Sequence, residues 1–225
     1  MGTIVTDVFE GMQYAVRFPD GYEEGKACPV LLFLHGAGTR GNDIANITRR
    51  KVLNRPDKMP GFPFVMVAPL CHENSWFDLL DTLKRFVLFL SKQSYTDKKR
   101  IYLTGNSMGG YGSWQLAMSM PEMFAALAPL CGGGMYWNAA RLVNVPIWAF
   151  HGGTDKVVLA QESKKMVEAV NKRGGNARLT IYPDHPHNCW DDTYDNPELY
   201  AWLLSHENKN VKELIDEYND ASAYG

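Results

Sequence analysis

Short apolar stretches recur along the chain, and their spacing indicates a sheet rather than a helical bundle. Two alternating segments, Thr3–Phe9 and Met12–Phe18, flank the turn pair Glu10-Gly11 and predict an antiparallel hairpin. Further along, short apolar runs predict strands that are covered on both faces, as in a parallel sheet. These runs are Val30–Leu34, Phe64–Ala68, Ile101–Thr104, Ala125–Leu130 and Pro146–Phe150, followed by a last strand at Arg178–Tyr182.

Between these runs the apolar period changes from that of a strand to that of a helix. In the segment Trp76–Ser94, leucines and aromatic residues recur at helical spacing on one face. Helices are also predicted at Tyr111–Met120, Glu162–Lys172 and Pro197–His206. Strands that alternate with helices after an opening hairpin predict an α/β fold, with a mostly parallel twisted sheet and helices on both faces.

Length and composition favour one globular catalytic domain. The chain has 225 residues, of which 45% are hydrophobic and 21% charged, enough for a substantial core. We expect a catalytic domain over residues 1–206 and a C-terminal tail over 207–225 that is a short helix or partly disordered. A net charge of -2 gives no electrostatic case for nucleic acid or an anionic membrane as partner.

The chain contains no recognisable targeting or membrane segment. Residues 1–10 lack the pattern of a signal peptide, and no apolar run approaches the ~20 residues that span a bilayer. The four cysteines, Cys28, Cys71, Cys131 and Cys189, are scattered without metal-binding spacing, which favours reduced thiols. We therefore expect a cytoplasmic protein, with secretion as the alternative if a signal peptide has been removed.

The strongest chemical signal is Gly105-Asn106-Ser107-Met108-Gly109, which fits the G-x-S-x-G pattern. It follows the predicted strand Ile101–Thr104 and precedes the predicted helix Tyr111–Met120. A strand, a glycine-flanked serine and a helix form a nucleophile elbow, whose tight turn exposes the hydroxyl at the top of a sheet. Ser107 is therefore the candidate nucleophile.

The partners of such a serine follow it along the chain in the order acid, then histidine. Asp155 lies just beyond the predicted strand Pro146–Phe150 and is the candidate acid, although it could instead cap the next turn. His185 and His187 both lie beyond the last predicted strand, and His185 precedes a proline that biases its backbone. A metal site built from Asp184, His185, His187 and Asp191 is a weaker interpretation, because one short loop would supply every ligand.

Two main-chain amides would complete such a site as an oxyanion hole. Met108 follows the nucleophile at the start of a helix, and Ala37 follows the predicted strand Val30–Leu34. The flanking glycines Gly36 and Gly38 would let that loop pass close to a substrate. We therefore expect the amides of Ala37 and Met108 to bind the oxyanion.

With these residues in place, the chain resembles the α/β-hydrolase superfamily of serine hydrolases. It is most similar to the bacterial branch of predicted peptidases, phospholipase/carboxylesterase-like proteins, and feruloyl and acetyl-xylan esterases. The resemblance extends from about Tyr14 to His206 and is carried by Leu34–Asp43, Arg100–Gly112, Trp148–Gly152 and Tyr182–Trp190. The family's usual Gly-His-Asp-Ser-Trp loop reads Pro-His-Asn-Cys-Trp here, at residues 186–190.

The resemblance implies an α/β-hydrolase fold and selects His187 as the base. It implies acyl transfer to Ser107, with Asp155 orienting His187, and no metal or organic cofactor. The segment between Leu130 and Pro146 is too short for a large cap domain, which favours small esters or esters presented on carbohydrate.

Aromatic residues in loops after strands are candidates for a pocket that binds a feruloyl-type or other small apolar acyl group. The leading hypothesis is a serine carboxylic ester hydrolase. A serine peptidase of the oligopeptidase type is the alternative, and a non-catalytic binding protein on the same fold is a remote one. The candidate pocket residues are Trp76, Tyr136, Trp137 and Trp190.

Overall fold

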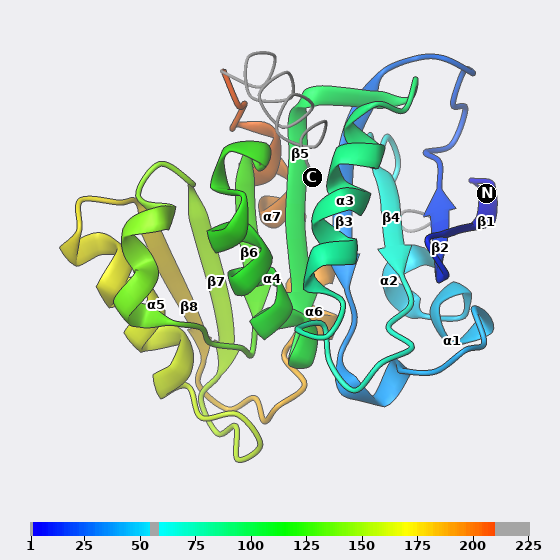
Figure 1. The fold of residues 1–225 in the computed structure, drawn as a ribbon. Helices are drawn as coiled ribbons and strands as arrows, with labels where there is room; N and C mark the ends of the chain where they lie inside the picture. The colour runs from blue at the N-terminus through cyan, green and yellow to red at the C-terminus, as the bar shows by residue number, and fades with distance from the viewer. Residues whose placement is uncertain (1, 55–58, 210–225) are drawn as a thin grey trace.

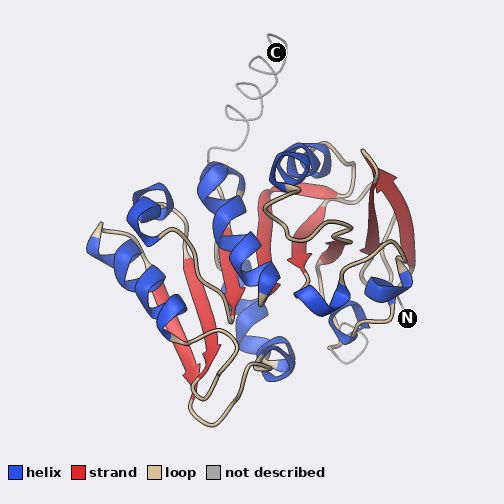
Figure 2. Cartoon of the chain, turned by 60° about the horizontal axis from the view of Figure 1, so that its bottom comes forward, coloured by secondary structure: helices blue, strands red, loops and turns tan. Residues whose placement is uncertain are grey.

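The computed structural model describes residues 2–54 and 59–209, and within them the chain forms an eight-stranded sheet with helices on both faces (Figures 1 and 2). The strand order is β1-β2-β4-β3-β5-β6-β7-β8. β1 pairs with β2 and β2 with β4 in antiparallel fashion, and every later pairing is parallel. The strands are β1 (Ile4–Phe9), β2 (Met12–Arg17), β3 (Cys28–Leu34), β4 (Val65–Pro69), β5 (Thr96–Asn106), β6 (Ala126–Leu130), β7 (Ile147–Gly152) and β8 (Ala177–Tyr182). The α/β prediction is therefore confirmed, hairpin included.

The sheet divides the core into two layers, because successive side chains of a strand point to opposite faces. In β3, Leu32 packs in one hydrophobic cluster and its neighbours Leu31 and Phe33 in the other. The first layer lies under α3 (Leu80–Ser91), α4 (Met108–Ser119) and α5 (Gln161–Lys172), which cover one face of the sheet in Figure 1. The second contains residues of α1 (Ala45–Thr48), α2 (Lys51–Asn54), α6 (Trp190–Asp195) and α7 (Pro197–Leu204).

Several elements differ from their predicted bounds for local reasons. Helix α3 begins at Leu80 rather than Trp76, because the preceding residues form a turn in which Asp78 accepts hydrogen bonds from the amide and hydroxyl of Ser75. Strand β5 begins at Thr96, where it pairs with Cys28 before a register shift. Helices α1, α2 and α6 were not predicted, because four to six residues are too few to show a helical period.

The connection between β6 and β7 is short and contains only the 3-10 turn Tyr136–Leu142, so no cap domain is inserted there. Residues 207–209 carry no helix, and the rest of the predicted tail lies outside the described residues. In the described ranges, none of the helices combines the length and apolar character needed to cross a bilayer. The division into a domain at 1–206 and a tail at 207–225 stays a prediction.

Candidate active site

Ser107 lies in the sharp turn between β5 and α4, with a φ of 56° and a ψ of -120°. A positive φ is strained for a residue with a side chain and marks a turn that the surroundings must hold in place. Glycines make this turn feasible, since a Cβ on Gly109 would overlap the carbonyl of Leu34 and one on Gly105 would overlap the carbonyl of Gly109. The sequence therefore folds locally into the elbow that its spacing predicts.

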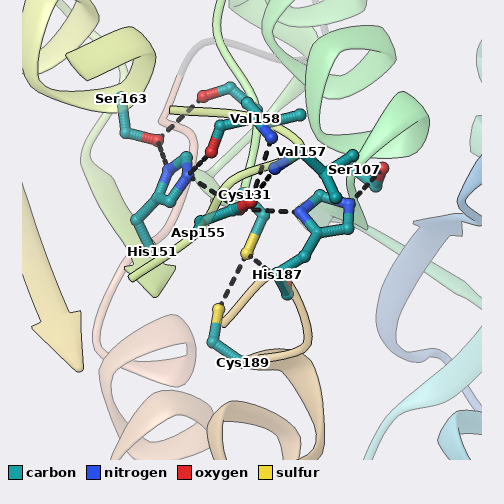
Figure 3. Close-up of polar contacts among 10 residues, drawn as sticks. Ser107, Cys131, His151, Asp155, Val157, Val158, Ser163, His187 and Cys189 are labelled. Atoms are coloured by element: carbon teal, nitrogen blue, oxygen red, sulfur yellow. Dashed lines mark hydrogen bonds and ion pairs between the residues drawn. The ribbon is translucent and has the colours of Figure 1, made fainter. Parts of the chain in front are cut away.

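Ser107, His187 and Asp155 form a continuous hydrogen-bonded relay, although they come from three distant parts of the chain (Figure 3). The hydroxyl of Ser107 lies 2.8 Å from Nε2 of His187. Nδ1 of His187 lies 2.7 Å from Oδ2 of Asp155. Because the carboxylate can only accept, Nδ1 carries the proton and Nε2 is free to accept from the serine. This is the arrangement that activates a serine hydroxyl as a nucleophile.

The carboxylate of Asp155 is fully buried, but both of its oxygens accept hydrogen bonds from the protein. Its Oδ1 accepts hydrogen bonds from the amides of Val157 and Val158, at 2.8 and 2.9 Å. Burial alone would raise the pKa of Asp155, but the hydrogen bonds from His187 and from these two amides outweigh it and lower the pKa below its usual value. Asp155 therefore stays ionised at neutral pH, as an orienting acid must.

The structure separates the two histidine candidates. His185 points to Asp192 instead of the serine, through a short contact from its Nε2. The candidate metal set in the same loop, Asp184, His185, His187 and Asp191, is not gathered into a ligand cluster. Among the described residues, the side chains close enough to hold an ion are Cys131, His151 and Asp155, and both oxygens of Asp155 already accept hydrogen bonds.

Ala37 and Met108 are each the first residue of a helical turn, so their amides have no acceptor within that turn. His35 fixes the loop that carries Ala37: its Nδ1 lies 2.8 Å from the carbonyl of Gly36, and its Nε2 accepts the amide of Cys71 at 3.0 Å. The proton therefore sits on Nδ1, and desolvation lowers the pKa of His35 to about 4. In a trans peptide, holding the Gly36 carbonyl towards His35 turns the Ala37 amide the opposite way.

A cavity of about 730 Å³ opens beside Ser107, within the size range of small-molecule sites. Its wall includes His187 and the loop from His35 to Thr39, and the two arginines Arg49 and Arg50 contribute positive charge. Val157, whose amide binds Asp155, also lines the cavity and is 73% exposed. The same loop thus binds the acid and forms part of the cavity wall.

One of the four candidate pocket aromatics lines this cavity. Trp190 lies on the wall and meets the ring of His187 edge-on, with centroids 5.5 Å apart. Trp76 is buried instead, and its indole donates to the carbonyl of His35 at 2.9 Å, so it supports the loop from behind. Tyr136 and Trp137 are exposed, and the carbonyl of Trp137 is bound by Arg173 beyond the C-terminal end of α5. The structure thus places Trp190 on the wall of this cavity and does not bring Trp76, Tyr136 or Trp137 to it.

Sequence reasoning missed two groups that contact the relay. The thiol of Cys131, a residue with a φ of 47°, lies 3.1 Å from the carbonyl of His187 and 2.9 Å from the thiol of Cys189. His151 lies 3.2 Å from Oδ2 of Asp155. For His151, its position at the end of a buried strand was a signal in the sequence. Nothing in the sequence indicated the contacts of Cys131.

Comparisons with known proteins find relatives over most of the chain. A profile of the dienelactone hydrolase family matches residues 66–218, more than half of the chain. The chain is 28% identical over 195 residues to a bifunctional acetylxylan esterase/xylanase of Neocallimastix patriciarum, covering 83% of this chain and 27% of that protein. It thus spans about a quarter of that relative's length.

Solved structures show the same architecture. The crystal structure of a thermostable esterase has a TM-score of 0.75 and 33% identity, covering 92% of this chain and 63% of that one. The feruloyl esterase module from Clostridium thermocellum, complexed with sinapinate, has a TM-score of 0.67 and 17% identity, covering 90% and 87%. On the extent of the profile match, this chain belongs to the dienelactone hydrolase family of the α/β-hydrolase superfamily.

Proposed function

We propose that the protein is a serine carboxylic ester hydrolase that works through an acyl-enzyme. The observation that carries the proposal is the relay from Ser107 through His187 to Asp155, with contacts of 2.8 and 2.7 Å. Membership of a hydrolase family and the likeness to esterases support the reaction class.

In the proposed acylation step, the Ser107 oxygen attacks the ester carbonyl while Nε2 of His187 takes its proton. The carbonyl oxygen becomes an oxyanion, which the amides of Ala37 and Met108 would bind. When the tetrahedral intermediate collapses, His187 gives its proton to the departing alcohol and the acyl group stays on Ser107. Water then attacks the acyl-enzyme in the same way and releases the carboxylic acid product. Asp155 stabilises the imidazolium of His187 during both acylation and deacylation.

For the substrate, we propose small or aromatic acyl esters, with feruloyl and acetyl esters of plant carbohydrate as the leading candidates. The cavity size suits such an acyl group, and Trp190 offers an aromatic surface beside His187. Without a cap domain between β6 and β7, an ester attached to a larger carbohydrate could approach Ser107. The acetylxylan and feruloyl esterases among the similar proteins point to the same substrates.

The test is hydrolysis of p-nitrophenyl acetate by the wild type and by a folded Ser107→Ala variant. We expect the wild type to turn over and the variant to lose roughly four to six orders of magnitude in kcat. Equal turnover by both proteins would rule out Ser107 as the nucleophile. A panel of feruloyl esters, acetylated xylan and peptides then sets the substrate class, and faster cleavage of peptides would favour the peptidase alternative.

A further inference from the structure

A second histidine contacts the acid of the relay from the side opposite to His187. His151 lies in β7, four residues before Asp155, and its side chain is completely buried. Figure 3 shows its ring between Ser163 and Asp155, with His187 and Ser107 beyond the carboxylate. The acyl-transfer steps leave this imidazole without a role.

The neighbours of His151 determine where one of its protons lies. Nε2 is 2.9 Å from the carbonyl of Val158 and 3.2 Å from Oδ2 of Asp155. Both groups can only accept, so Nε2 must carry a hydrogen. On the other side of the ring, Nδ1 is 2.8 Å from the hydroxyl of Ser163, which also lies 2.8 Å from the carbonyl of Gly132. The ring is therefore held at both nitrogens.

Hydrogen bonds link the imidazole to the turn that holds the acid, and Nε2 also lies within ion-pair distance of Oδ2 of Asp155. The amide of Val158 donates to Oδ1 of Asp155, while the carbonyl of the same residue accepts from His151. The turn that supplies donors to the carboxylate is thus fixed from its other side by the imidazole. Because His151 and the carboxylate are both buried, water is poorly placed to replace a lost donor.

We propose that His151 is a positioning residue for Asp155, so that its Nε2–H holds both the carboxylate and the Val157–Val158 turn in the orientation that His187 requires. This inference rests on the proposed function. Without His151, Oδ2 loses a neighbouring donor and the turn can relax, so His187 is held less firmly in its reactive tautomer. The effect falls on turnover rather than on substrate binding, because His151 does not line the cavity.

A double-mutant cycle tests this route of action with p-nitrophenyl acetate. We expect His151→Leu to lower kcat by about 10- to 100-fold, as a misplacement of catalytic groups does, with KM within about 2-fold of the wild type. Asp155→Asn lowers kcat by about 10⁴-fold. If His151 acts through Asp155, adding His151→Leu to Asp155→Asn changes kcat by less than about 2-fold. The same loss in both backgrounds would overturn the proposal, because a packing defect costs activity whichever residue occupies position 155.

A conservative variant adds a second, independent readout. The amide of His151→Gln can place an N–H near the position of Nε2, whereas His151→Asn is too short to reach the Val158 carbonyl. We expect the glutamine variant to stay within about 3-fold of the wild-type kcat and the asparagine variant to behave like the leucine variant. Equal activity of the two amides contradicts the proposal, and this pair carries the test if the leucine variant does not fold.

Two controls separate this inference from the proposed function. His206→Gln makes the same substitution at a histidine outside the site and should leave kcat unchanged. If Ser107→Ala or Asp155→Asn alone keeps wild-type activity, the acyl-transfer proposal itself fails. If those two variants are inactive but His151→Leu retains full kcat, only the positioning role of His151 is wrong.

Discussion

At the scale of single residues, burial decides which histidine is available for proton transfer. His187 remains partly exposed, at 19% for its side chain, and faces Ser107. His35 is buried and holds its loop in place, because one ring nitrogen hydrogen-bonds to the carbonyl of Gly36 and the other to the amide of Cys71. Both histidines follow strands in the sequence, but the side chain of His187 is partly exposed and that of His35 is buried.

The environment of His35 predicts a pH dependence of stability. Unfolded histidine takes up a proton below about pH 6.5, whereas desolvation keeps the pKa of native His35 at about 4. Between these values the unfolded state binds more protons, so the free energy of unfolding falls as the pH drops through this window. The full loss below pH 4 is about 3 kcal/mol.

Urea unfolding of the wild type and of His35→Gln between pH 7.5 and 4 measures this contribution. The glutamine variant cannot bind the proton, so we expect its unfolding free energy to fall less steeply than that of the wild type across the window. Parallel curves for the two proteins would show that His35 is not a buried neutral imidazole. Carboxylates that titrate in the same range cancel in the comparison.

Residue order along the chain indicated Ser107, Asp155 and two candidate histidines, and the resemblance to known hydrolases selected His187 over His185. The serine pattern, the strand before Asp155 and the loop of His187 are local signals, and the structure places these side chains within hydrogen-bond distance. The contacts of His151 depend on how β7, the Val157–Val158 turn and α5 come together, which no local pattern records. The same holds for Trp76, because the sequence around a loop tryptophan does not indicate whether its side chain faces a cavity or the core.

At the scale of elements, the elbow depends on how closely α4 approaches β3. Gly109 in the first turn of α4 sits against the carbonyl of Leu34 at the end of β3. That contact positions the start of α4, including the amide of Met108, beside the loop that carries Ala37. A side chain at Gly109 would push these two elements apart.

Gly109→Ala should therefore destabilise the fold as well as abolish activity. Overpacking against backbone, which cannot rotate away, costs about 3 kcal/mol, which corresponds to a fall in Tm of roughly 6–12 °C for a chain of this size. The matched control is Gly38→Ala, whose added methyl meets nothing within 4 Å and whose φ is not in the left-handed region. Calorimetry that finds equal Tm values for both variants would contradict the close packing described for the elbow.

Strands and long helices were predictable because their periods extend over enough residues, as in α5 and the β3 run. Short helices were not: α6 has six residues, with Asp191 and Asp192 in its first turn, so its pattern resembles that of a polar loop. The missed helix nevertheless begins at Trp190, the aromatic residue that lies against His187. Here the site depended on an element too short for sequence periodicity to reveal.

At the scale of the whole molecule, the fold needs no covalent cross-link within the described residues. All four cysteines are free and buried: Cys28 and Cys71 lie in the first core layer, and Cys131 and Cys189 lie beside the relay. Burial raises the pKa values of Cys28 and Cys71, which keeps these thiols protonated and unreactive. The expectation of reduced thiols agrees with this arrangement.

Titration with a chromogenic disulfide reagent checks this picture without any substitution. We expect four thiols per chain to react in guanidinium chloride without reductant, and essentially none in the native protein over the same minutes. Fewer than four in denaturant would reveal a disulfide. Rapid reaction of the native protein would mean that the thiols beside the relay are accessible.

The proposed mechanism requires that Ser107 is the residue that becomes acylated. The most direct measurement is reaction with diethyl p-nitrophenyl phosphate, which phosphorylates an activated serine irreversibly, followed by intact-mass and peptide-mass analysis. We predict one nitrophenolate released per chain and one phosphoryl group on the peptide that contains Ser107, with none on Ser107→Ala and much slower labelling of His187→Ala. A modification at another residue, or no modification of the native protein, would contradict the proposed mechanism.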